Sequence, residues 1–347
     1  MLSLNAVLND FKEINPNRTE STYNTMKFNL FRLTKITNIA FADLNPEIFN
    51  NPTYIIDLID KKYSLNTRVA TILGIIVLLK YFHKTSPTHQ LLSLIFSYEK
   101  KLNISSVKVN KIIDEQQLTE TEAKNWIDYN VLLKRFLAYI NTEFLQENSG
   151  YTYNEIRNVS LMALYVLLPP SRIGNYRLMK IRYEKKRSAT QLQKKYNYLM
   201  ITKDNKFSIV FNQYKTKKYI GQVDKTIDNV VLEKLLKLYL KRREVMTNKQ
   251  NTWLFINQYS REMSQTNITD TLKFVSNLIV KKELSVNMFR HIYLTDYTKK
   301  NNTIKNNKLT AEFMGQTYTP TMMEKYKKYE IEINKINKNK EYVIKFN

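Results

Sequence analysis

The stretch SVNMFRHIYLTDY, Ser285 to Tyr297, places an arginine and a histidine in the middle of an apolar, helix-spaced segment. At 3.6 residues per turn, one stripe of the predicted helix is apolar and consists of Val286, Phe289, Tyr293 and Tyr297. A neighbouring face carries Asn287, Arg290 and His291. We expect these polar groups to converge beside a buried stripe. Taken alone, such an arginine is explained more simply by a buried ion pair with a carboxylate, so its meaning depends on the rest of the chain.

A second arginine follows two prolines in the stretch LPPSRIGNY. Pro169 and Pro170 end a buried helix predicted from about Asn154 to Leu168, and a new helix is predicted directly afterwards. Arg172 therefore lies at a helix start, where backbone N–H groups and the helix dipole favour an anion. Its planar fork can bind two phosphate oxygens at once. Two such arginines on separate helices can hold the charge of a pentacoordinate phosphoryl transition state.

Lysines mark one turn of a small predicted sheet. The segments YNYLMIT, KFSIVFNQY and KKYIGQ are expected to form a three-stranded antiparallel meander. Lys215 falls where the second and third of these strands turn, so its ammonium can reach into a groove and protonate a departing 5′ oxygen. The neighbouring Lys217 and Lys218 favour the alternative of a surface that clamps phosphates.

The C-terminal stretch MGQTYTPTMMEKYKKY contains a candidate nucleophile. Gly315 is expected to end one helix, and Thr321 and Glu324 are spaced as a capping box for the next helix, which carries Tyr326. A phenol with its usual pKa of about 10 is a poor nucleophile, but positive neighbours favour the phenolate, which can carry a covalent intermediate. Among 24 tyrosines, packing is the alternative role for any single one.

The charge of the chain indicates a polyanionic partner. Its 347 residues carry a formal net charge of +24, and neutralising phosphates releases condensed counterions, which drives association with nucleic acid. No segment reaches the roughly 18 uncharged apolar residues of a membrane span, and the N-terminus lacks a signal-peptide pattern. We therefore expect a soluble protein located wherever its DNA is, with no membrane partner.

The residues that are scarce exclude several kinds of site. There is no cysteine and there are only three histidines, which rules out disulfide frameworks and thiolate nucleophiles and argues against a metal site. Five glycines leave little room for a Gly-rich nucleotide cradle. We expect neither a metal nor a cofactor.

Apolar periodicity predicts a mainly α-helical fold in two domains. Residues 1–115 contain four or five helical patterns, including the nearly all-apolar YSLNTRVATILGIIVLLKYF with Ser64 as its cap, and another whose cap is Ser21 or Thr22. The polar, acidic piece from Asp114 to Glu122 reads as a linker or exposed turn. Residues 116–347 then hold the sheet and further helices, and form the second domain with a basic C-terminal tail.

Taken in order, these motifs resemble the tyrosine recombinase and phage-type integrase family, with which type IB topoisomerases share a catalytic core. SRIGNYRLMKI looks like the family's first arginine box, YKTKK like its hairpin lysine, and NMFRH like its His-x-x-Arg box. FMGQTYTPTMMEKY is similar to its Leu-Gly-His segment with a trailing tyrosine, and LPPSR resembles the viral and mobile-element branches. The N-terminal helices are similar to the family's core-binding domain. The resemblance thus implies the catalytic residues Arg172, Lys215, Asn287, Arg290, Gln316 and Tyr326.

Three positions depart from the family pattern. Asn287 stands in place of a histidine and Gln316 in place of a histidine or tryptophan, and each amide can still donate a hydrogen bond to a phosphoryl oxygen. Tyr326 comes one residue later than the common spacing, which leaves Tyr329 as a competitor and Tyr318 as a lesser one.

The resemblance implies that the tyrosine attacks a scissile phosphate of double-stranded DNA, giving a 3′-phosphotyrosyl link and a 5′ hydroxyl that attacks a partner strand. Neither a metal nor a nucleotide cofactor is required, because the covalent link conserves the bond energy. The family commonly acts as a homo-oligomer of four protomers on DNA. The tail INKINKNKEYVIKFN either reaches a neighbouring protomer or serves as a basic DNA-binding arm.

Three other functions remain open on the sequence. A DNA-binding protein of the same fold, weakened in catalysis by Asn287 and Gln316, would bind DNA without forming adducts. A type IB topoisomerase would use the same residues but would relax supercoiled plasmid without a specific site. A metal-dependent transposase is disfavoured because no acidic triad stands out.

Overall fold

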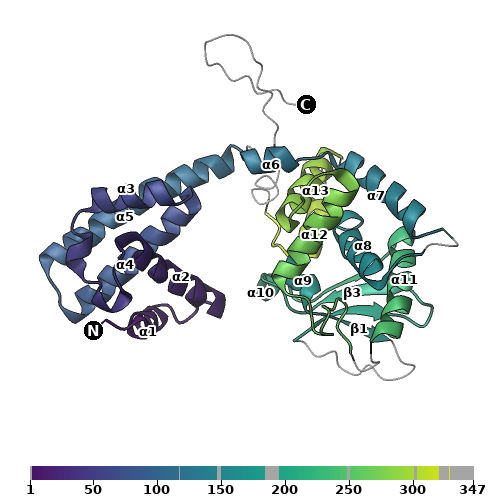
Figure 1. Cartoon of the computed structure of the whole chain (residues 1–347), viewed down its shortest axis with the longest axis horizontal. Helices are drawn as coiled ribbons and strands as arrows, with labels where there is room; N and C mark the ends of the chain where they lie inside the picture. The colour runs from purple at the N-terminus through teal and green to yellow at the C-terminus, as the bar shows by residue number, and fades with distance from the viewer. Residues whose placement is uncertain are drawn as a thin grey trace, which may run out of the picture. The chain divides into compact units, whose positions relative to one another are not determined.

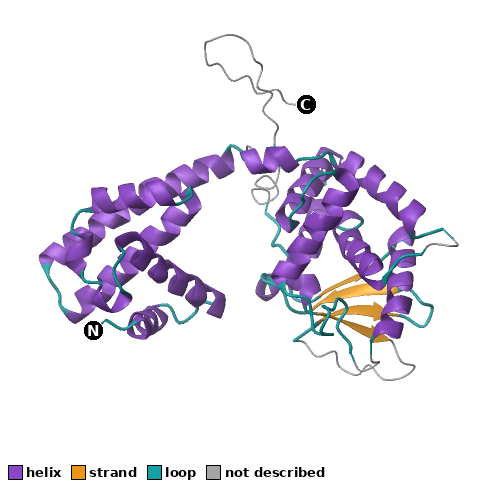
Figure 2. Cartoon of the chain, viewed as in Figure 1, coloured by secondary structure: helices purple, strands orange, loops and turns teal. Residues whose placement is uncertain are grey.

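The computed structural model describes residues 2–116, 118–146, 150–183, 195–247, 251–300, 303–319 and 328. By its internal contacts the chain divides into two compact units, Met1–Glu115 and Gln116–Asn347 (Figure 1). The described residues are mainly helical, and the strands all belong to one small sheet in the second unit (Figure 2). The predicted fold class is confirmed.

The first unit is a helical bundle. Its helices are α1 (Leu4–Ile14), α2 (Glu20–Thr37), α3 (Pro52–Lys62), α4 (Leu65–Thr85) and α5 (His89–Asp114), with 3₁₀ turns at η1 (Phe41–Asp43) and η2 (Pro46–Phe49). Helix α2 begins earlier than predicted, because Thr19 rather than Ser21 or Thr22 accepts the capping hydrogen bond, from the N–H of Thr22 at 3.4 Å. Ser64 is the N-cap residue of α4, as predicted, although its side chain makes no capping bond to the backbone.

Helix α4 organises the bundle. It packs against α1, α2, α3 and α5, and a Cβ atom at Gly74 would lie 3.2 Å from the backbone of Asn29, so glycine permits the close approach of α2. By length and composition alone, α4 also fits a membrane-spanning helix. In the bundle its apolar residues Ile72, Ile75, Ile76, Leu78 and Leu79 belong to the core instead.

The second unit surrounds helix α8 with other helices beside a four-stranded sheet (Figure 1). Its helices are α6 (Glu120–Asn125), α7 (Tyr129–Glu143), α8 (Tyr153–Val166), α9 (Ile173–Arg177), α10 (Lys217–Ile220), α11 (Val230–Met246), α12 (Gln265–Val280), α13 (Val286–Lys300) and α14 (Ile304–Phe313). Its strands are β1 (Met179–Tyr183), β2 (Asn197–Ile201), β3 (Phe207–Phe211) and β4 (Val223–Thr226). The predicted linker is partly helical, because Thr119 and Glu122 form a capping box that starts α6.

The sheet is mixed and has the order β1-β2-β3-β4. Strands β2, β3 and β4 form the predicted antiparallel meander, while β1 pairs parallel to β2 and was not predicted as a strand. The predicted third strand KKYIGQ was also misplaced, because Lys217–Ile220 forms the short helix α10 and β4 begins only at Val223. Gly221, with φ of 84°, ends that helical turn in a conformation that favours glycine.

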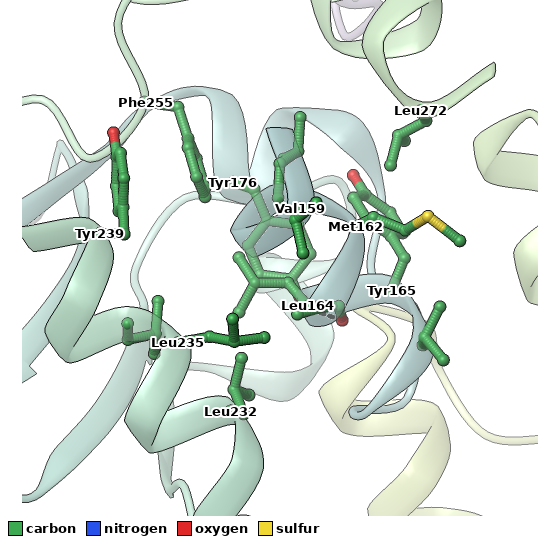
Figure 3. Packing of buried hydrophobic residues seen from close by; sticks show 14 of the residues in the cluster. Val159, Met162, Leu164, Tyr165, Tyr176, Leu232, Leu235, Tyr239, Phe255 and Leu272 are labelled. Carbon is green, nitrogen blue, oxygen red and sulfur yellow. Dashed lines mark hydrogen bonds between the residues drawn. The ribbon is translucent and has the colours of Figure 1, made fainter. Parts of the chain in front are cut away.

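Aromatic side chains join the helices to the sheet. The rings of Tyr165 on α8 and Tyr176 on α9 (Figure 3) meet edge-to-face at 5.2 Å between centroids. Tyr176 also meets Phe211 of β3 at 5.9 Å. On α11, Tyr239 stacks on Phe255 at 5.5 Å (Figure 3). The two ring contacts of Tyr176 hold α9, and therefore the residue that precedes it, against both α8 and the sheet.

Candidate active site

Arg172 is the N-cap residue of the short helix α9. It directly follows the prolines that end α8, as the sequence predicts, although α9 has only five residues. Its guanidinium Nη1 donates a hydrogen bond to the backbone carbonyl of Gly315, 143 positions further along the chain. The first arginine box and the Gly-Gln segment therefore meet in the folded protein.

The residues next to Arg172 hold the same two segments together. The Ser171 hydroxyl donates to the carbonyl of Phe313 at 2.5 Å, and the Asn175 amide donates to the Ser171 hydroxyl at 3.4 Å. Gly315 ends the turn after α14 with φ of 67°, and a Cβ atom at this position would lie 2.9 Å from the Asn175 amide nitrogen. The backbone conformation favours glycine, and a Cβ atom would also have to displace the Asn175 side chain.

Lys215 lies in the connection from β3 to α10, and its side chain is exposed. The next residue, Thr216, donates its hydroxyl hydrogen to the carbonyl of Gly315 at 2.8 Å. This carbonyl also accepts the hydrogen bond from Arg172. One carbonyl oxygen thus joins the arginine, the lysine turn and the Gly-Gln segment.

A buried asparagine connects the lysine turn to α9 from the other side. The amide of Asn197, at the start of β2, donates to the carbonyls of Asn175 at 2.8 Å and Gln213 at 2.9 Å. Its side-chain oxygen accepts from the N–H groups of Asn212 at 2.8 Å and Gln213 at 2.7 Å. Both ends of the Asn197 amide are therefore bonded. Asn197 holds Gln213, two residues before Lys215, in a fixed position relative to α9.

Arg290 is buried in α13, with 1% of its surface exposed. Burial raises the pKa of the Tyr165 and Tyr176 hydroxyls well above the usual value, and the positive charge of Arg290 partly opposes this rise. The Arg290 guanidinium therefore lies close to two phenols, one of which belongs to the helix that Arg172 begins.

The other polar residues of α13 lie in different surroundings. Asn287 is exposed and His291 is half-buried, so the predicted polar face does not share one environment. Burial raises the pKa of the Glu122 carboxyl, but hydrogen bonds from Thr119 and the positive charges of Lys328 and His291 outweigh burial and lower it. His291 therefore lies near Glu122 in the first turn of α6.

Gln316 is buried directly after Gly315, with 3% of its surface exposed. Its backbone N–H donates to the carbonyl of Ala311 at 2.9 Å, which closes the end of α14. Gln316 thus lies next to the carbonyl that accepts from Arg172.

The two strongest candidates for the nucleophile, Tyr326 and Tyr329, lie outside the described residues, as does the predicted capping box of Thr321 and Glu324. Tyr318 is half-buried and packs with Tyr293 and Tyr297 against a small cluster of Leu294, Ala311 and Met314. Lys328 is described: its N–H donates to the Thr295 hydroxyl at 3.1 Å, and its ammonium lies 3.6 Å from a Glu122 carboxylate oxygen.

Four residues around the site were not predicted from the sequence: Ser171, Asn175, Asn197 and Thr216. Ser171 and Asn175 flank Arg172, and Thr216 follows Lys215, so neighbourhood was the only available signal. Asn197 begins a strand and carried no signal at all. Among the described residues, no group of three or more acidic or histidine side chains is placed to hold a metal ion.

No protein-family model matches the chain, and no curated protein matches it. Its structure is similar to that of the XerH site-specific recombinase bound to difH substrate before cleavage, with a TM-score of 0.55 and 16% identity, covering 94% of this chain and 82% of that chain. The post-cleavage complex of XerH with palindromic difH substrate gives a TM-score of 0.53 at 16% identity, covering 92% and 79% of the two chains. These similarities establish that the chain has the fold of a tyrosine recombinase.

Proposed function

We propose that this protein is a site-specific DNA recombinase or integrase that cuts and rejoins DNA through a 3′-phosphotyrosyl intermediate. The observation that carries the proposal is the carbonyl of Gly315, which accepts hydrogen bonds from both Arg172 and Thr216. Three motifs that are far apart in the sequence, and that follow the order expected of a recombinase, thus come together at one oxygen. The fold supports the same conclusion.

In the proposed reaction, the phenolate of Tyr326 attacks the phosphorus of the scissile phosphodiester. The bond from phosphorus to the 5′ oxygen breaks, and the ammonium of Lys215 supplies the proton to that oxygen. Arg172 and Arg290 hold the non-bridging oxygens, on which negative charge accumulates in the transition state. The amides of Asn287 and Gln316 donate hydrogen bonds to the same oxygens.

The surroundings of the two arginines suit this division of work. A guanidinium has five N–H donors, so the bond from Arg172 to Gly315 is compatible with a two-oxygen contact to phosphate. Arg290 is buried next to two neutral phenols, so its charge acts through a medium less polar than water. A charge in such a medium interacts more strongly with a phosphate than it would in solution.

We propose that the first unit binds the DNA, as a core-binding domain does. Residues 116–347 are proposed to catalyse strand cleavage and rejoining. Four protomers on two duplexes would exchange strands, with the basic C-terminal tail contacting DNA or a neighbouring protomer. We further propose a viral or mobile-element recombinase, on the strength of the LPPSR form of the first arginine box. Covalent storage of the phosphodiester energy removes any need for a nucleotide cofactor or metal.

Capture of a covalent adduct tests the function and also finds a substrate. The protein is incubated with a pool of nicked duplexes with a randomised core, and DNA that stays attached after denaturation is amplified through repeated rounds. We expect one sequence class to be enriched, and Arg172→Ala to abolish the adduct while retaining its melting temperature. Failure of the wild-type protein to form any adduct overturns the proposal.

The replacements at Asn287 and Gln316 favour one second candidate, a DNA-binding protein of this fold without catalysis. In that case, selecting duplexes only for binding to the protein would yield a preferred sequence, but the protein would never form a covalent adduct with it. A type IB topoisomerase would instead relax supercoiled plasmid with little sequence preference. Relaxation without an enriched sequence class therefore identifies that third function.

A further inference from the structure

The connection between β3 and β4 positions its candidate acid through the backbone. Tyr214 donates its hydroxyl hydrogen to the carbonyl of Gly221 at 2.5 Å, and the N–H of Gly221 donates to the carbonyl of Lys217 at 2.8 Å. These two bonds close the connection on itself. Within the described part of the chain, the ammonium of the exposed Lys215 makes neither a hydrogen bond nor an ion pair.

A side chain without polar contacts is placed by the backbone that carries it. The Lys215 backbone has a fixed point on each side. Two residues before it, the carbonyl and N–H of Gln213 are both bonded to Asn197. One residue after it, the hydroxyl of Thr216 is bonded to the carbonyl of Gly315 at 2.8 Å.

The two fixed points differ in what they connect. Asn197 joins the connection to α9 and is fully buried, so it also supports the core. Thr216 is half-buried and shares its acceptor with Arg172, a residue of the proposed phosphate site. The Thr216 hydroxyl therefore links the lysine connection to the same carbonyl that Arg172 contacts.

We infer that Thr216 is a positioning residue, which holds the β3–β4 connection against Gly315 so that Lys215 meets the leaving oxygen of a phosphate held by Arg172. This inference rests on the proposed function. It assigns Thr216 no contact with DNA, because its hydroxyl is bonded to Gly315. A small displacement of a proton donor strongly reduces its contribution, since proton transfer requires hydrogen-bond distance.

Hydrogen exchange tests the tether without any DNA. Thr216→Val removes the hydroxyl and keeps the branched shape, Thr216→Ser keeps the hydroxyl, and Thr226→Val is a matched control at an exposed position of β4. We expect amides of residues 212–221 to exchange faster in Thr216→Val alone, with the melting temperatures of all variants unchanged. Equal exchange in Thr216→Val and wild type overturns the tether.

A substrate with sulfur at the 5′ bridging position tests whether the tether serves Lys215. A thiolate leaves without a proton, because a thiol is far more acidic than an alcohol. The substrates are built on the duplex recovered by adduct selection. We expect Thr216→Val and Lys215→Ala to slow cleavage of the oxygen substrate by at least about tenfold, and by about hundredfold if proton donation is lost completely. Both variants should cleave the sulfur substrate nearly as fast as wild type, and Thr216→Ser should be close to wild type on both substrates.

The outcomes separate the possible failures. Equal slowing of Thr216→Val on the oxygen and sulfur substrates means that Thr216 acts through Arg172 and the phosphate, which overturns its role toward Lys215. Normal cleavage by Thr216→Val overturns the inference while leaving the proposed function intact. If wild type forms no adduct on any duplex, the proposed function fails, and the catalytic part of the inference fails with it.

Discussion

Arg243 and Arg290 are both buried, but their guanidinium groups have different surroundings. Arg243 on α11 donates to the carbonyls of Asn251 at 2.9 Å and Trp253 at 2.6 Å, and so anchors the chain that follows α11. Arg290 lies close to the phenols of Tyr165 and Tyr176. We propose that Arg290, unlike Arg243, serves to bind phosphate.

Replacing each arginine by methionine should separate the two roles. Arg290→Met removes the proposed contact to the scissile phosphate, so adduct formation should fall by about 10²-fold to 10³-fold at temperatures well below its melting temperature. Arg243→Met leaves two partly buried carbonyls without this donor, at up to about 1–3 kcal/mol each, so its melting temperature should fall. Thermal unfolding and adduct assays below the melting temperature distinguish the two. Similar melting and activity changes in both variants would contradict the roles assigned here.

Glycine is required at Gly315 by both its conformation and its surroundings. Gly315→Ala places a Cβ atom 2.9 Å from the Asn175 amide nitrogen at φ of 67°, and the conformation alone costs about 1 kcal/mol or more. Gly221→Ala meets the same conformational penalty with no atom within 4 Å. Gly174→Ala meets neither and is the control.

We expect the free energy of unfolding to decrease in the order Gly174→Ala, Gly221→Ala, Gly315→Ala. Urea denaturation of the three variants measures this order. A Gly315→Ala protein as stable as Gly174→Ala would show that the turn after α14 is not held against Asn175.

At the scale of elements, the α6 capping box connects stability to pH. The Glu122 carboxylate accepts hydrogen bonds from the N–H and hydroxyl of Thr119 at 2.9 and 3.0 Å and lies 3.6 Å from the ammonium of Lys328. Burial raises the pKa of this carboxyl, but these partners outweigh burial and lower it below 4.5. The carboxylate therefore stabilises the fold at pH values above 4.5, and this stabilisation disappears as pH falls through the lowered pKa.

Glu122→Gln should consequently be less stable than wild type near neutral pH and should approach wild type under acid conditions. Urea midpoints of both proteins across this pH range give the measurement, with Glu120→Gln as a control in the same first turn, since Glu120 is exposed. A stability difference that stays constant with pH would show that Glu122 acts through its shape and not through its charge.

Prediction from sequence succeeded where one strong local signal determined an element. Apolar periodicity located α2, α3, α4, α5 and α8, and a glycine after an apolar run located the end of α14, whereas α1 was not predicted. It failed at β1, because Met179–Tyr183 carries no clear alternation and is extended only through pairing with β2 and with residues near Trp253. It also failed at Lys217–Ile220, where the closure between Tyr214 and Gly221 overrides strand propensity.

The candidate site was likewise only partly predictable from the sequence. Order along the chain was enough to select Arg172, Lys215, Arg290 and Gln316 as candidates, since these residue types suit phosphoryl chemistry. Sequence could not predict that the Gly315 carbonyl joins Arg172 to Thr216, or that Asn197 supports the lysine connection. The acceptors of these bonds are backbone carbonyls, which every residue has. The residue types in the sequence therefore do not indicate where such bonds form.

At the scale of the whole molecule, we expect the net charge of +24 to dominate the proposed binding to DNA. If several phosphates are neutralised, affinity for the selected duplex should fall by about 10³-fold or more between about 50 mM and about 200 mM salt. Fluorescence anisotropy with a labelled duplex gives the slope, and a matched duplex of scrambled sequence gives the nonspecific component. An affinity that barely changes with salt would argue against phosphate-dominated binding.

The most direct test of the whole account is to identify the residue that becomes attached to DNA. After incubation with the selected duplex, the adduct is digested with protease and nuclease, and the peptide carrying a nucleotide is sequenced by mass spectrometry. We predict a 3′-phosphate joined to the oxygen of Tyr326, and loss of the adduct in Tyr326→Phe but not in Tyr318→Phe. A nucleotide attached to a residue that is not a C-terminal tyrosine, or through a 5′-phosphate, would contradict the account.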